Sequence, residues 1–135
     1  MKYRYALMLA GMLAGMLAAN SVWADEFQDR VALAKQAIEM PAGAAYDQLL
    51  MPYIQTSVKQ CLVLKANTNS VEQFTLVGSV SNNGQLVDVQ VQPKTPFADC
   101  FVGQFTQASL PSPELSQIKQ TPHPIVVNVL LKLGS

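Results

Sequence analysis

The stretch that decides the fold runs from Phe74 to Val91 and reads FTLVGSVSNNGQLVDVQV. Apolar residues alternate with polar ones on both sides of the Asn83-Gly84 pair, which is the pattern of two β-strands. Asn-Gly between alternating segments is the strongest short signal of a β-hairpin, because a type I′ turn needs a positive φ at two successive residues. We therefore expect antiparallel strands over residues 74–80 and 85–92, joined by a type I′ turn.

Side-chain alternation assigns a face to the residues of each predicted strand. In the return strand, Val87, Val89 and Val91 are expected to share one face, and Pro93 ends the strand. The segment 125–133 is the third predicted strand. One of its faces would carry Ile125, Val127, Val129, Leu131 and Leu133. The other would carry Val126, Asn128, Leu130 and Lys132.

Helical periodicity appears in three other segments. Residues 25–40 place Phe27, Val31, Ala34 and Ile38 on one stripe. A second helix is expected over about 44–59; it contains Pro52, which predicts a kink near residues 48–52 or two short helices. The third helix is expected over 97–108. We assign four aromatic residues at helical spacing, Tyr46, Tyr53, Phe101 and Phe105, to the core and not to a ligand pocket.

This order of elements predicts an α+β fold, with two N-terminal helices followed by a ββαβ unit. The hairpin makes strands one and two antiparallel, and the helix after strand two returns the chain to its starting end. An all-antiparallel sheet then needs strand three beside strand one. We expect a three-stranded sheet of order 2-1-3, with helices on one face and residues 125–133 at an edge.

The N-terminus is expected to be a cleaved secretory signal peptide, residues 1–24. Lys2 and Arg4 precede an uncharged run, and small or aliphatic residues at positions 22 and 24 suit a signal peptidase. A membrane anchor is the rival interpretation, but the run is shorter than the roughly 20 apolar residues of a spanning helix. The product, residues 25–135, would be one domain, secreted or periplasmic, with no membrane insertion after cleavage. Within it, residues 25–60 form the helical pair and residues 61–133 the ββαβ unit.

The charge balance of residues 25–135 argues against some partners. Removal of Lys2 and Arg4 leaves seven Lys/Arg against nine Asp/Glu, a formal charge of −2. No basic stripe is present, so we expect no nucleic-acid partner.

The two cysteines, Cys61 and Cys100, are expected to form a disulfide. Exported domains meet an oxidising environment, and two cysteines allow one intramolecular pairing. Closing a loop of about 40 residues stabilises a fold by roughly 4 kcal/mol in the chain-entropy model. The alternative is a redox or metal pair. However, the spacing is not Cys-x-x-Cys, and His123 is the only histidine that could join a metal site.

The pattern of residues 61–133 resembles the TonB C-terminal-like fold. It combines a cysteine before an Asn-Gly hairpin, a Leu-Val-Asp-Val-Gln-Val strand, a helix with a second cysteine, a Leu110-Pro111 break and a final strand. After the signal peptide, the chain shows neither a transmembrane anchor nor the Pro-rich linker of TonB itself. The resemblance therefore implies a small binding domain, in which the exposed final strand can pair with an extended segment of a partner.

Functional motifs give little support to catalysis. His123 is the only imidazole base, and the sequence contains no GxSxG, HExxH, P-loop or dinucleotide motif. We expect no catalytic, cofactor-binding or metal-binding residues, and a small hydrolase is the least favoured function. The favoured one is an exported protein-binding domain of the bacterial envelope or secretome. A secreted inhibitor, immunity protein or host-directed factor is the alternative.

The predicted edge strand is the candidate partner-binding site. Its outer face carries Val126, Asn128, Leu130 and Lys132, and its backbone offers N–H and C=O groups for β-augmentation. Asn128 and Lys132 have a second interpretation, as residues that discourage aggregation at an edge. The partner protein is unknown, and an unprotected edge leaves a homodimer open.

Overall fold

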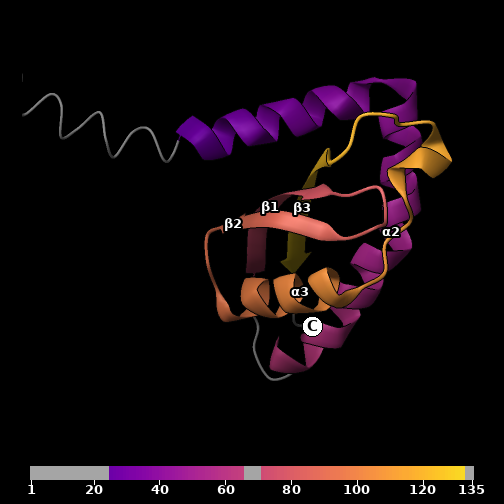
Figure 1. Ribbon diagram of the computed structural model, residues 1–135. Coiled ribbons are helices and arrows are strands. Elements are labelled where there is room, and N and C mark those ends of the chain that lie inside the picture. The colour runs from indigo at the N-terminus through magenta and orange to yellow at the C-terminus, as the bar shows by residue number, and fades with distance from the viewer. Residues whose placement is uncertain (1–24, 66–70, 133–135) are drawn as a thin grey trace, which may run out of the picture.

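A computed structural model of the chain describes residues 25–65 and 71–132 (Figure 1). The predicted signal peptide and Leu133 lie outside the described residues. A helix covers residues 25–39 and is followed by α2 (Pro41–Cys61) and the short 3-10 helix η1 (Leu62–Lys65). After residues 66–70 come β1 (Val71–Val80), β2 (Leu86–Gln92), α3 (Pro96–Gln107), the 3-10 helix η2 (Pro113–Ser116) and β3 (His123–Lys132).

The sheet has the predicted topology. Its strand order is β2-β1-β3, and both pairings are antiparallel. β1 is central, and it pairs with β3 from Val71 opposite Lys132 to Val80 opposite His123. The α+β class, the order of strands and the place of the last strand at an edge are therefore confirmed.

The hairpin is present, but its predicted type I′ turn is wrong. The Gly84 amide donates to the Ser81 carbonyl at 3.0 Å, and the Ser81 amide donates to the Gln85 carbonyl at 2.9 Å. Gly84 has φ +83°, whereas Asn83 keeps a negative φ. These bonds describe a three-residue loop with glycine at the left-handed position, which is the next most common hairpin connection.

A β-bulge changes the faces of β2. Val77 lies opposite Gln90 and Ser79 lies opposite Val87, so β2 has one extra residue here. The extra residue is Asp88, with φ 54°. The bulge reverses the alternation that we predicted, and Val87 does not share a face with Val91. Instead Leu86 turns inward at 5 % exposure, and Val87 is 36 % exposed.

Helices α2 and α3 cover one face of the sheet. Between them and the sheet lies the main core, in which the Phe101 ring stands 5.4 Å from Phe74 and 5.3 Å from Phe105. Tyr46, Phe101 and Phe105 are fully buried as predicted, and Tyr53 is half-buried at the margin. α2 continues through Pro52 as one helix, so two short helices do not form.

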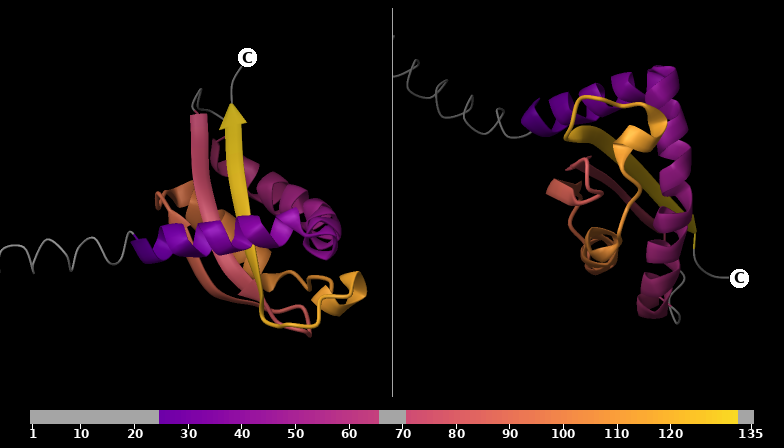
Figure 2. Two further views of the ribbon diagram at one scale, coloured as in Figure 1. Left: turned by 90° about the horizontal axis from the view of Figure 1, so that it is seen from above. Right: turned by 45° about the vertical axis from the view of Figure 1, so that its right-hand side comes forward.

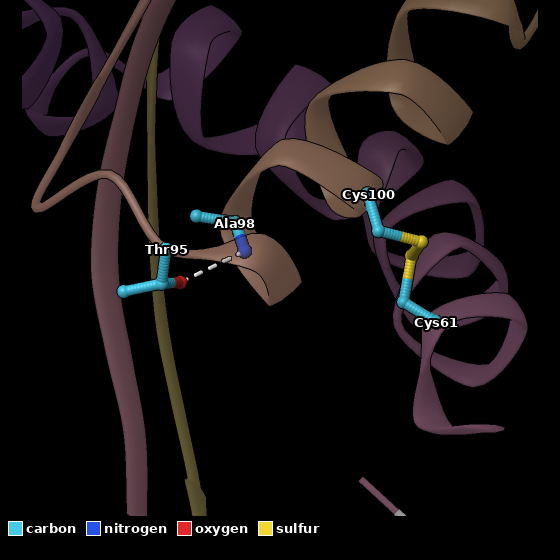
Figure 3. The surroundings of a disulfide bond; sticks show 4 residues. All are labelled: Cys61, Thr95, Ala98 and Cys100. Carbon is cyan, nitrogen blue, oxygen red and sulfur yellow. Dashed lines mark hydrogen bonds between the residues drawn. A yellow bond between two sulfur atoms is a disulfide. The ribbon is translucent and has the colours of Figure 1, made fainter. Parts of the chain in front are cut away.

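The predicted disulfide joins the end of α2 to α3. The Cys61 and Cys100 sulfurs are bonded, with 5.9 Å between the two Cα atoms (Figure 3). α3 begins at Pro96, directly after its N-cap residue Thr95. The Thr95 hydroxyl oxygen accepts a hydrogen bond from the Ala98 amide at 3.1 Å, which satisfies a donor of the first helical turn. The cap and the disulfide together fix where α3 starts and what it packs against.

The helix over residues 25–39 lies on the opposite face of the sheet, where we had not placed a helix. Its stripe of Phe27, Val31 and Ala34 packs on Val77 and Val126. In Figure 2, left, this helix crosses in front of β1 and β3, with α2 and α3 behind them. Val77 and Val126 lie directly opposite each other, and both point away from the main core. They form the small apolar patch that this helix covers.

Candidate binding edge of the sheet

β3 has one free backbone edge. It pairs with β1 over ten consecutive residue pairs without a register shift, and it has no second strand neighbour in the described sheet. Alternate residues of such a strand direct their N–H and C=O groups away from the sheet. Pro124 lacks an N–H group, so the usable edge runs from Ile125 to Lys132. The edge has a regular register, and its first residues lie beside α2 around Ile125.

The structure separates Val126 from the other three predicted site residues. Val126 is only 7 % exposed, because the helix over residues 25–39 packs on it. Its side chain is therefore part of a core and cannot contact a partner at this edge. Sequence reasoning missed this because alternation identifies the face of a side chain but not what covers that face.

Asn128, Leu130 and Lys132 are exposed and lie together on the uncovered half of the sheet face. The Asn128 Oδ1 atom accepts a hydrogen bond from the Thr75 hydroxyl at 2.8 Å, across the β1–β3 pair. Leu130 is 60 % exposed, and the neighbouring Val71 is 61 % exposed. Figure 2, left, shows that the helix over residues 25–39 crosses the strands midway, leaving their ends near the C-terminus bare on this side. The accessible site is smaller than predicted and gains Val71.

His123, the only candidate base, is enclosed at the start of β3. It is 7 % exposed, and its ring meets the Tyr46 ring edge-on with 5.4 Å between centroids. Burial lowers the pKa of His123, since the charged imidazolium loses its hydration. The pKa of Tyr46 is raised to about 12. Burial is the larger cause, and the negative charge of Tyr53 is the smaller one. The Tyr46 hydroxyl donates to the Pro111 carbonyl at 2.8 Å.

The space beside His123 is too small to admit a water molecule, and no nucleophile borders it among the described residues. Its polar side chains are those of His123, Tyr46 and Asp47, and no serine, threonine or cysteine is among the described residues that line it. Burial raises the pKa of Asp47. In the described part of the chain, no three His, Cys, Asp or Glu side chains gather as metal ligands would.

Comparison with known proteins finds no matching family model, no similar curated protein and no similar solved structure. Across residues 25–65 and 71–132, no helix has the length and apolar character needed to span a bilayer.

Proposed function

We propose that this chain is an exported, non-enzymatic protein-binding domain, and that a partner's extended segment adds to the sheet beside β3. The resemblance to TonB C-terminal-like domains, which implies the same mode of binding, supports the proposal. The Cys61–Cys100 disulfide supports an oxidising compartment, either the periplasm or the extracellular medium.

The observation that carries the proposal is the contrast between the two edges of the sheet. β2 is interrupted by the bulge at Asp88, and the carbonyl of Asp88 already accepts a hydrogen bond from Arg30 at 2.6 Å. β3 stays regular along its whole length. A bulge interrupts an edge and shortens the stretch that can pair, so the long regular edge of β3 is the one that suits a long extended partner.

Two proline variants near the end of β3 test whether the backbone N–H groups at its free edge contribute to partner binding. Of the neighbouring residues Leu130 and Leu131, one directs its N–H toward β1 and the other toward the free edge. Leu130→Pro and Leu131→Pro should therefore differ. One should lower the free energy of unfolding, while the other should stay as stable as the wild type and lose roughly tenfold or more in partner affinity. Partners are captured from the envelope fraction and the medium of the producing cell, identified by mass spectrometry and titrated as synthetic segments.

Two aspartate variants test the contribution of side chains to binding, one on the proposed surface and the other, as the control, away from it. Leu130→Asp places a charge on the proposed surface, whereas Leu115→Asp changes a leucine that is 72 % exposed on η2. Only the first variant should weaken the captured partner. Equal binding by the wild type and both proline variants, each shown to be folded, would contradict the edge-strand proposal.

A further inference from the structure

A second groove runs along the other edge of the sheet, between β2 and α3. Four consecutive residues, Val89–Gln92, line it together with Lys94, Asp99 and Val102, around a volume of about 330 Å³. Successive side chains of a strand point to opposite faces. The side chains of four consecutive residues lie on both faces of the sheet. They can therefore border a single groove only if that groove runs along the backbone edge of the strand.

Asp99 and Val102 of helix α3 line the opposite side of this groove. Figure 1 shows α3 alongside the sheet. Asp99 and Val102 are three residues apart, so they lie on the same side of the helix. Residues 93–95 connect β2 to α3, and Lys94 among them lines the groove. At the other edge of the sheet, α2 instead of α3 lies beside the start of β3, around His123 and Ile125.

The backbone edge of Val89–Gln92 is free to bind. β2 pairs only with β1 in the described sheet. Since N–H and C=O groups alternate in direction along a strand, two of these four residues direct theirs into the groove. A ligand that supplies matching groups at strand spacing is itself an extended peptide.

The side chains of the groove define what such a peptide would carry. Val89, Val91 and Val102 belong to the apolar cluster beside the groove, which suits a small apolar side chain. The Asp99 carboxylate has no hydrogen-bond or ion-pair partner among the described residues, although its place in the first turn of α3 also suits the helix dipole. Lys94 also lines the groove, so a basic side chain complements the groove on the α3 side, beside Asp99, and not beside Lys94.

We propose that the groove between β2 and α3 binds a short extended peptide as a strand beside Val89–Gln92. The peptide places an apolar residue against Val102 and a Lys or Arg within reach of Asp99. The site is independent of the β3 edge, because β2 and β3 lie on opposite sides of β1. Its four residues span roughly 13 Å, so it selects a short motif.

The probe is a fluorescein-labelled, amidated peptide of sequence Thr-Lys-Thr-Val-Thr-Lys-Thr. Its Lys, Val and Lys side chains share one face, and the symmetric placement serves either strand direction. The control peptide has Glu in place of both Lys. Binding is measured by fluorescence anisotropy at low ionic strength, on the protein as recovered from an expressing cell with its disulfide oxidised. We expect the Lys peptide to bind at least about tenfold more tightly than the Glu peptide.

Two variants test the assignment of Asp99 and Val102. Asp99→Lys should invert the preference toward the Glu peptide, whereas Glu39→Lys, with the same change of net charge on the helix over residues 25–39, should not. Val102→Phe fills the groove and should weaken the Lys peptide by roughly tenfold. Val63→Phe, at a valine that is 75 % exposed on η1, should leave binding unchanged.

Amide chemical-shift mapping on the wild type gives a result that does not depend on the folding of any variant. Shifts confined to residues 89–94 and 99–102 support the groove. Shifts along residues 125–132 instead would assign the peptide to the β3 edge, and would overturn the groove while leaving the proposed function standing. Equal affinity for the two peptides, or no binding of either, would also overturn it.

Discussion

At the scale of single residues, glycine decides where the hairpin can dock. Gly84 has φ +83°, and a Cβ atom on it would lie 2.1 Å from the Leu110 carbonyl oxygen. The Leu110 amide also donates to the Gly84 carbonyl at 3.3 Å, so the segment after α3 packs directly on the hairpin loop. The Asn-Gly pair therefore serves a tertiary contact as well as a local turn.

Replacing Gly84 should destabilise the protein for both reasons. We expect Gly84→Ala to lower the free energy of unfolding by about 2–3 kcal/mol, measured by urea titration. Gly103→Ala is the matched control, because a Cβ on Gly103 meets no heavy atom within 4 Å and α3 is helical there. It should raise stability by about 0.5–1 kcal/mol. If the two variants had the same free energy of unfolding, the hairpin loop could move away from Leu110 without loss of stability.

At the scale of elements, one arginine links the helix over residues 25–39 to the bulge in β2. Arg30 donates to the Asp88 carbonyl at 2.6 Å and to the Gln90 Oε1 atom at 3.0 Å. The bulge leaves the Asp88 carbonyl without a place in the β1–β2 ladder, and the guanidinium supplies a charged donor to it. Among the described buried apolar residues, the small patch of Val77 and Val126 receives the helix on this face.

Loss of Arg30 should loosen this helix and leave the rest of the fold intact. Arg30→Ala should speed amide hydrogen exchange across residues 25–39 by roughly tenfold, corresponding to about 1.4 kcal/mol, with β1 unchanged. Lys35→Ala, at an exposed cation of the same helix, should change exchange little. If Arg30→Ala exchanges at the wild-type rate, the apolar stripe alone holds the helix.

At the scale of the whole molecule, the disulfide holds the helical layer together. It ties the last residue of α2 to the middle of α3, with 39 residues of sequence separation that include β1, β2 and their hairpin. The ordered chain between the two cysteines therefore loses conformational freedom in the unfolded state when the bond is closed.

Removing both sulfurs should lower global stability. Cys61→Ala with Cys100→Ala should reduce the free energy of unfolding by up to about 4 kcal/mol relative to the oxidised wild type in urea. Reduction of the wild type by a thiol reagent should give a comparable loss. Coincident unfolding curves for the double variant and the oxidised protein would instead show that packing alone determines the stability of the α2–α3 layer.

The sequence by itself determined the order of elements, the sheet order and the disulfide, because each follows from local periodicity, one turn signal or the count of cysteines. It also placed residues 125–132 at an edge. It could not determine the bulge at Asp88, because that depends on how β2 meets β1 at Gly78, where a Cβ would lie 2.9 Å from Leu86 Cδ1. Once the bulge is present, Val87 turns out and Leu86 turns in.

Only the tertiary structure decided which face receives the helix over residues 25–39 and, with it, which edge residues remain accessible. An apolar stripe at helical period predicts that a helix is buried on one side but not against which surface. Here it covers Val126 and leaves Asn128, Leu130 and Lys132 exposed. The groove between β2 and α3 is also a tertiary result, because the packing of α3 beside the sheet brings Asp99 and Val102 opposite residues 89–92.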